Sequence, residues 1–310
     1  MTGTVKVFKN ILSLLSERAV VPAVNLLLVV FIARYMGAQG LGRYAVIVGF
    51  VSFFDIFLDL GINTLIIREV ARDRSSVDAL VARAVTLKLA VTPVIFVSIA
   101  VFLRFFEYPP DVVRAFYIFS AASVLIAFSE TFNSLYKAFE RMNLVALMVF
   151  LRQVFIVAAV VAAMEMGYGI TGIAVSYLAI AACYLLLNYL LFTLRVGKIK
   201  IGLDRHFHVR LFERSLPFIT VGFFFVLFFR LDVVMISAVA DDAQAGLFSA
   251  ALKVVSSLML LSAAFLEAVF PVISKYEAGS PEKMRAAVKK AFHLLSLVSF
   301  PMAAGLVVTA

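Results

Sequence analysis

The chain has 310 residues, of which 64% are hydrophobic and only 15% are charged. A soluble globular domain is about half apolar and about a quarter charged, so this composition excludes one. The net charge of +9 would suit nucleic-acid binding in a soluble protein, but here the basic residues cluster between apolar runs, and we expect no nucleic-acid partner. The sequence predicts an all-α, polytopic transmembrane helix bundle in contact with membrane lipid.

Apolar runs interrupted by charges and turn residues mark nine candidate spans. In chain order they are 11–33, 44–67, 84–103, 115–136, 143–164, 170–194, 215–240, 245–274 and 291–310. The first run follows basic residues but lacks a small-residue cleavage pattern, so we interpret it as a retained helix and not a signal peptide. Gly, Pro and acidic residues predict tight turns on one side of the membrane, at 36–40, 107–111, 165–169 and 240–243.

The distribution of basic residues predicts the orientation of these spans. Alternate loops, at 1–18, 68–88, 137–141, 195–214 and 275–290, contain 21 Lys and Arg residues, and the other loops contain four. Cytoplasmic loops carry the excess of positive charge. We therefore expect a multi-pass protein of the cell (plasma or inner) membrane with a cytoplasmic N-terminus.

Polar residues recur at helical spacing inside several spans. The second span carries Ser52, Asp55, Asp59 and Asn63 on one face, and the other stripes are Glu130, Asn133, Ser134 and Lys137; Tyr177, Tyr184 and Asn188; and Lys253, Ser256, Ser257 and Glu267. Ionisable groups at membrane depth face a cavity or a partner. The stripes indicate a central water-accessible cavity; alternatively, each stripe only joins helices through hydrogen bonds.

A weak internal repeat is visible between the two halves of the chain. Gly42-Arg43-Tyr44-Ala45 opens the second span as Gly246-Leu247-Phe248-Ser249 opens the eighth. Such repeats are typical of transporters, although helix starts can also simply look alike. The pattern predicts a six-helix bundle over 1–200 and the start of a second bundle over 201–310. Nine spans would then be present of an expected twelve to fourteen, which suggests a C-terminally truncated sequence.

Motifs of soluble enzymes are absent from the sequence, and we expect no enzyme activity, cofactor or metal site. The single cysteine, Cys183, lies in an apolar run. Asp204, His206 and His208 would be the only candidates for a membrane-embedded enzyme of polyprenyl-phosphate metabolism, and a headgroup-facing loop explains them better. A non-transporting scaffold would not explain polar stripes on several helices.

The stretch 33–45, ARYMGAQGLGRYA, resembles the signature after the first helix of Wzx-type oligosaccharide-lipid flippases, a branch of the multidrug/oligosaccharidyl-lipid/polysaccharide (MOP) exporter superfamily. The pieces LG at 60–61 and REVAR at 68–72 resemble that family's second-helix exit. Asp232 followed by GLFSAA at 246–251 resembles its seventh-to-eighth helix segment. The resemblance runs over essentially the whole chain and implies a MOP-exporter-like fold.

Such a transporter would move polyprenyl-diphosphate-linked oligosaccharide from the inner to the outer leaflet by alternating access, for surface polysaccharide biosynthesis. The candidate substrate-binding cations are Arg152, Arg230 and Lys253, with Arg34 at the outer mouth. Candidates for coupling to protons or sodium are Asp55, Asp59, Glu130, Asp232 and Glu267. These roles rest on charge and expected burial.

The charge count inside the spans leaves a second interpretation open. Five acidic residues accompany three basic ones, Arg152, Arg230 and Lys253, whereas a cavity for an anion should be net cationic. An ion-coupled exporter of cationic drugs or metabolites, of the multidrug (MATE) branch, fits that count at least as well. The signature at 33–45 favours the flippase.

Overall fold

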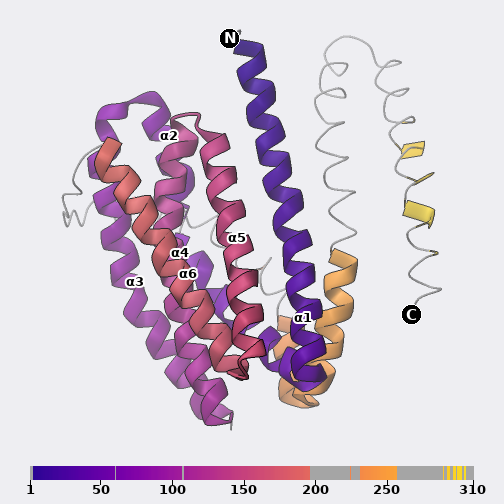
Figure 1. Cartoon of the computed structure of the whole chain (residues 1–310). Helices are drawn as coiled ribbons and strands as arrows, with labels where there is room; N and C mark the ends of the chain where they lie inside the picture. The colour runs from indigo at the N-terminus through magenta and orange to yellow at the C-terminus, as the bar shows by residue number, and fades with distance from the viewer. Residues whose placement is uncertain are drawn as a thin grey trace. The chain divides into compact units, whose positions relative to one another are not determined.

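The computed structural model describes residues 3–59, 61–106, 108–195, 224 and 231–256 and isolated positions after 288, with side chains from residue 24 onward. It divides into two compact units, Met1–Ser249 and Ala250–Ala310, and each is described here by itself. The labelled elements of the first unit (Figure 1) are α1 Gly3–Asp59, α2 Ile62–Arg72, the 3₁₀ turn η1 Arg74–Ser76, α3 Val77–Phe105, α4 Pro110–Ala138, α5 Met142–Glu165 and α6 Gly169–Arg195.

The first two predicted spans are two helices that meet at a kink and together carry the label α1. The turn predicted at 36–40 is present, because Gly37 departs from helical geometry between them, with φ 69° and ψ −174°. A side chain at that φ would be strained, and glycine avoids the strain. The apolar stretch Val24–Arg72 is 49 residues long, enough for two crossings of about 20 residues each.

The second predicted span, 44–67, is wrong as one continuous helix. α1 ends at Asp59 and α2 begins at Ile62, with Gly61 between them at φ 71°. The left-handed conformation of Gly61 interrupts the helical hydrogen-bond ladder. The break places Asp59 at a helix end, where its carboxylate accepts a hydrogen bond from the Asn63 N–H at 3.3 Å.

The third to sixth predicted spans are confirmed as α3, α4, α5 and α6, each extending a few residues beyond its predicted bounds. The turns between them have the expected chemistry. α4 begins at Pro110, and Gly167 and Gly169 take positive φ between α5 and α6. Residues 231–239 and 242–256 are helical on either side of the turn predicted at 240–243. The rest of the seventh and eighth spans and most of the ninth lie outside the described residues, as does the predicted boundary at 200.

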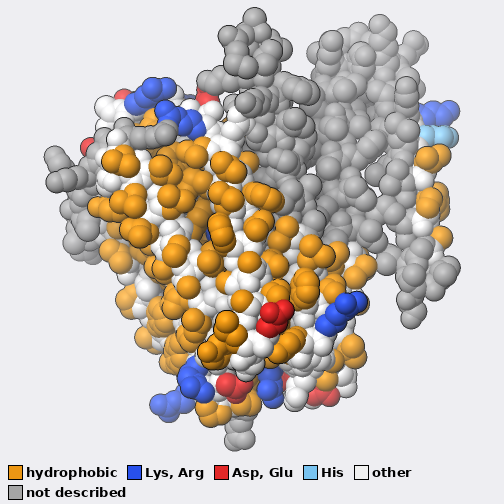
Figure 2. Space-filling view, in the orientation of Figure 1, with side chains coloured by type: hydrophobic (Ala, Val, Ile, Leu, Met, Phe, Trp, Pro, Cys, Tyr) orange, Lys and Arg blue, Asp and Glu red, His pale blue; other side chains and the backbone are white. Residues whose placement is uncertain are grey.

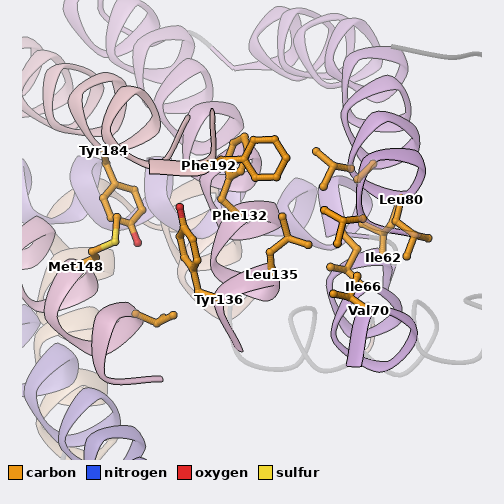
Figure 3. Close-up of a cluster of buried hydrophobic side chains, with 14 of the residues drawn as sticks. Ile62, Ile66, Val70, Leu80, Phe132, Leu135, Tyr136, Met148, Tyr184 and Phe192 are labelled. Carbon is orange, nitrogen blue, oxygen red and sulfur yellow. The ribbon is translucent and has the colours of Figure 1, made fainter. Parts of the chain in front are cut away.

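α4 lies at the centre of the first unit and contacts α1, α2, α3, α5 and α6. Its inward residues pack in a cluster with side chains of α2, α3, α5 and α6 (Figure 3). The cluster includes Ile62, Ile66, Val70, Leu80, Phe132, Leu135, Tyr136, Met148, Tyr184 and Phe192. Burying a large apolar side chain away from water stabilises a fold by about 1.5–3 kcal/mol. Lipid is apolar too, so within the bilayer these side chains stabilise the bundle through close packing with one another.

The outer surface of the bundle is apolar. Val94, Val97 and Leu186 are each more than half exposed. Hydrophobic side chains cover the middle of the face seen in Figure 2, and charged side chains gather towards its two ends. Five helical stretches in the described residues are long and apolar enough to cross a membrane. The chain is a multi-pass membrane protein.

The orientation can be tested at the turn between the helical residues 231–239 and 242–256. Asp241 is exposed there. In a Cys183→Ala background, we expect a cysteine introduced by Asp241→Cys to react with a membrane-impermeant thiol reagent added to intact cells. The positive-inside distribution is the reason for this expectation. Reaction only after the cells are broken would reverse the orientation.

Candidate functional site

A lysine is completely buried in the middle of the bundle. Lys88 on α3 has 0% of its surface exposed, and its Nζ donates hydrogen bonds to the Ala127 carbonyl oxygen at 2.5 Å and to Thr131 Oγ1 at 2.6 Å, both on α4. Counting Lys88 among the basic residues of a loop over 68–88 was wrong, because α3 already begins at Val77. The position of Lys88 inside the apolar run 84–103 could have indicated a cation within a membrane span.

Two carboxylates interact electrostatically with this lysine. Asp59 at the end of α1 and Glu130 on α4 both interact electrostatically with the Lys88 ammonium. A charge inside a low-dielectric bundle is costly unless opposite charges and hydrogen bonds compensate it. The lysine has both kinds of compensation, from two neighbouring helices.

Glu130 extends the line of charges to a fourth helix. Arg152 on α5 places its Nη1 3.6 Å from Glu130 Oε1, with 14% of the arginine side chain and 33% of the glutamate side chain exposed. Asp59, Lys88, Glu130 and Arg152, on α1, α3, α4 and α5, are thus linked by electrostatic interaction, and we call these four residues the charge chain. It brings together three of the residues predicted from sequence and one that was missed.

Arg152 is not fully satisfied by this contact. Its guanidinium lies over the Tyr184 ring, 5.0 Å from the ring centroid, in a cation–π arrangement. Its buried Nε and Nη1 atoms have no hydrogen-bond acceptor among the described residues. Buried donors without acceptors are uncommon, and an arginine fork matches the oxygens of a phosphate. The guanidinium is therefore the group in the described bundle best suited to receive an anion.

Uncharged polar side chains surround the charge chain. Tyr184 accepts a hydrogen bond from Asn133 Nδ2 at 2.9 Å, which joins the predicted stripes of the fourth and sixth spans. The Tyr44 and Tyr177 hydroxyls lie 3.0 Å apart. Several stripe residues therefore serve as hydrogen-bonded contacts between helices, the alternative that the sequence left open, while the charged members lie together.

The other predicted site residues lie elsewhere. Asp55, one turn before Asp59, is exposed and accepts a hydrogen bond from Ser123 Oγ, and Arg34 is exposed on α1. Asp232 accepts a hydrogen bond from the Val233 N–H at 2.8 Å. Lys253 is half-buried and belongs to the second unit. Arg230 and Glu267 lie outside the described residues, as do His206 and His208.

The two copies of the sequence repeat meet directly. A Cβ added to Gly42 would lie 1.6 Å from the Asp242 carbonyl oxygen, and one added to Gly246 would lie 2.0 Å from the Ala38 carbonyl oxygen. Gly42 thus packs against the carbonyl of Asp242, which lies four residues before Gly246, and Gly246 packs against the carbonyl of Ala38, which lies four residues before Gly42. This reciprocal backbone contact, which we call the glycine contact, requires the absence of both side chains and lies at the two similar motifs that open the second and eighth spans.

Polar side chains reinforce the glycine contact. Arg43 Nε donates to Asp242 Oδ2 at 3.2 Å, and Ser237 Oγ donates to Asp242 Oδ1 at 2.7 Å. Tyr108, between α3 and α4, lies against the same residues. Burial raises the pKa of its phenol, and the Asp242 carboxylate raises that pKa further, while a hydrogen bond with Ser237 lowers it. The turns predicted at 107–111 and 240–243 are therefore in contact.

The described residues form a polytopic helix bundle with a buried lysine and a mostly buried arginine inside it. The chain belongs to the family described as polysaccharide biosynthesis protein, whose model matches residues 7–277. No curated protein matches the sequence.

Several solved structures with a similar fold are described as transporters. The MATE multidrug transporter DinF-BH, solved as a complex, is 15% identical, with a TM-score of 0.69 over 96% of this chain and 74% of that one. An inward-facing MATE family transporter of the MOP superfamily is 17% identical, with a TM-score of 0.62 over 94% and 72%. A MOP-superfamily transporter from Pyrococcus furiosus, whose binding pocket is described as reversed in polarity, is 15% identical, with a TM-score of 0.55 over 97% and 72%.

Proposed function

We propose that the protein translocates a polyprenyl-diphosphate-linked oligosaccharide from the inner to the outer leaflet by alternating access. The observation that carries the proposal is Arg152, a mostly buried guanidinium with two donor atoms that lack acceptors among the described residues. A diphosphate cannot cross hydrocarbon unaided, and bidentate contact with an arginine would compensate its charge. The apolar outer surface of the bundle suits the prenyl chain, which stays in lipid.

The family match supports a role in polysaccharide biosynthesis, and the revised charge count weakens the charge argument for an exporter of cations. With Lys88 placed inside a span, the basic residues assigned to the spans rise from three to four against five acidic ones. Two of those acidic residues, Asp59 and Glu130, are engaged with Lys88 and Arg152. Export of cationic drugs therefore has less support than the sequence alone suggested.

The glycine contact supports an alternating-access cycle. It joins the second and eighth spans at the side of the membrane that the basic loops assign to the exterior. In alternating access the outer side of the protein is closed while the headgroup binds from the cytoplasm, and it opens to release the headgroup. Two related halves perform this motion around a central site. In this proposal the glycine contact and the Arg43 to Asp242 ion pair hold the outer side closed.

The role of Arg152 can be tested in cells that depend on the full-length protein for surface polysaccharide. We expect Arg152→Ala to abolish the polysaccharide and leave the protein in the membrane, because the diphosphate loses its bidentate partner. Polysaccharide by gel staining and protein by membrane immunoblot are the measurements. Arg114→Ala is the matched control, since Arg114 is exposed and donates a hydrogen bond to the Pro110 carbonyl of its own helix. Normal polysaccharide from Arg152→Ala would remove the residue from the mechanism.

A further inference from the structure

Two tyrosines join the helix of the glycine contact to the helix that packs on Arg152. Tyr44 on α1 follows Arg43 directly in sequence, and its hydroxyl lies 3.0 Å from the Tyr177 hydroxyl on α6. Tyr184 lies about two turns further along the same face of α6, with the Arg152 guanidinium over its ring, 5.0 Å from the centroid. One face of α6 therefore connects the candidate anion site with the residue next to the arginine of the outer ion pair.

Aromatic packing surrounds the pair of Tyr44 and Tyr177, which we call the tyrosine pair. Tyr44 is 9% exposed, and the Phe119 ring on α4 packs against both tyrosines, with its centroid 5.9 Å from the Tyr44 ring and 5.0 Å from the Tyr177 ring. A hydroxyl in apolar surroundings needs a hydrogen-bond partner, and Tyr44 is the partner that the structure describes for Tyr177. Moving α1 away from α6 at this point breaks that hydrogen bond.

We propose that the tyrosine pair keeps Arg43 within reach of Asp242 and transmits the binding of an anion at Arg152 to the outer side of the protein. The proposal rests on the proposed function, because the anion is the diphosphate of the substrate. The outer ion pair and the tyrosine hydrogen bond are made by successive residues of α1, so a shift of this part of α1 changes both contacts together. The two tyrosines are thus positioning residues, which act through Arg43.

The direction of the effect follows from the cation–π contact on α6. The Arg152 guanidinium is attracted to the Tyr184 ring because the arginine carries a positive charge. A bound diphosphate neutralises that charge and draws the guanidinium towards its own oxygens. The attraction between α5 and α6 then weakens, α6 holds the tyrosine pair less firmly, and the outer side opens more readily. Binding of the headgroup from the cytoplasm thus promotes its release on the other side.

The tyrosine hydrogen bond can be tested with a thiol that the closed glycine contact covers. Ala245 is 0% exposed and precedes Gly246, so in a Cys183→Ala background the thiol of Ala245→Cys should react with a maleimide only when the contact opens. In the purified full-length protein, we expect Tyr44→Phe and Tyr177→Phe each to speed this reaction by about 2- to 10-fold. The double variant should show less than the product of the two effects, because one hydrogen bond can be lost only once.

Transmission from the anion site can be tested by adding inorganic pyrophosphate to the same reaction. We expect pyrophosphate to speed the reaction of the Ala245→Cys thiol by about 2- to 30-fold, the range expected for loss of a cation–π contact. Tyr44→Phe with Tyr177→Phe should still bind pyrophosphate, as measured by a shift in Tm, but should lose most of the acceleration. Arg152→Ala should lose both. A purely structural tyrosine pair would change the Tm and leave the acceleration by pyrophosphate intact.

A control and a second reporter complete the experiment. Tyr189→Phe removes a hydroxyl from an exposed position of α6 and should leave the reaction unchanged. Leu41→Cys, at a position 2% exposed and next to Gly42, replaces Ala245→Cys if that protein does not fold. Unchanged thiol reactivity in both phenylalanine variants, or an acceleration by pyrophosphate that persists in the double variant, overturns the proposal. Failure of pyrophosphate to bind the wild-type protein would instead contradict the proposed function, and the phenylalanine variants would still decide whether the tyrosine pair holds the outer side closed.

Discussion

Lys88→Met should lower the free energy of unfolding by about 2–6 kcal/mol, because each of two buried acceptors loses its donor at a cost of about 1–3 kcal/mol. The substitution keeps the volume of the side chain. It leaves the Ala127 carbonyl and the Thr131 hydroxyl without their donor, and Asp59 and Glu130 without their shared cation. Unfolding of the purified protein, followed by heat or denaturant, is the measurement.

The matched control for this prediction is Lys137→Met in the last turn of α4, which removes a lysine outside the charge chain. The double variant Lys88→Met with Asp59→Asn should recover part of the lost stability, because it also removes one of the uncompensated carboxylates. A loss of less than about 1 kcal/mol from Lys88→Met would mean that the charges are not coupled as the geometry indicates.

Gly42→Val should slow transport strongly and leave the protein in the membrane. The first added carbon would lie 1.6 Å from the Asp242 carbonyl oxygen, and backbone cannot move aside as a flexible side chain can. Overpacking costs about 1–3 kcal/mol, which lowers the population of the closed contact by about 5- to 150-fold. Surface polysaccharide measured against the level of membrane protein is the readout.

Ala240→Val is the control, since it places the same valine side chain at an exposed position beside the same contact. Gly246→Val should behave as Gly42→Val does, because the glycine contact is reciprocal. Full activity of both glycine variants would show that the outer ends need not meet during transport.

Much of the fold is visible in the sequence, because the bilayer imposes long apolar runs separated by charged loops. α3 to α6 follow those runs closely. The break inside the second span was harder to predict. A glycine inside an apolar run is tolerated by many membrane helices, and the run gives no sign that Gly61 takes a positive φ.

The site was predictable in part. Helical phase indicated Asp59 and Glu130 as intramembrane charges, and the position of Arg152 inside an apolar span indicated a third; all three belong to the charge chain. Lys88 was assigned to a loop because it follows the basic residues of 68–83 closely in sequence. Phase alone could not show which of the stripes meet, because side-chain pairing across α1, α3, α4 and α5 depends on how the helices pack.

The most direct test of lipid-linked oligosaccharide transport is reconstitution of the full-length protein into liposomes. The liposomes contain a polyprenyl-diphosphate lipid with a fluorescent sugar, and a membrane-impermeant reagent that quenches the fluorophore irreversibly is added outside. We expect the quenched share to rise from that of the outer leaflet alone to nearly all of the lipid, and Arg152→Ala to remain at the outer-leaflet value. A protein that leaves the inner-leaflet lipid protected but moves a cationic dye across the same liposomes would contradict the account.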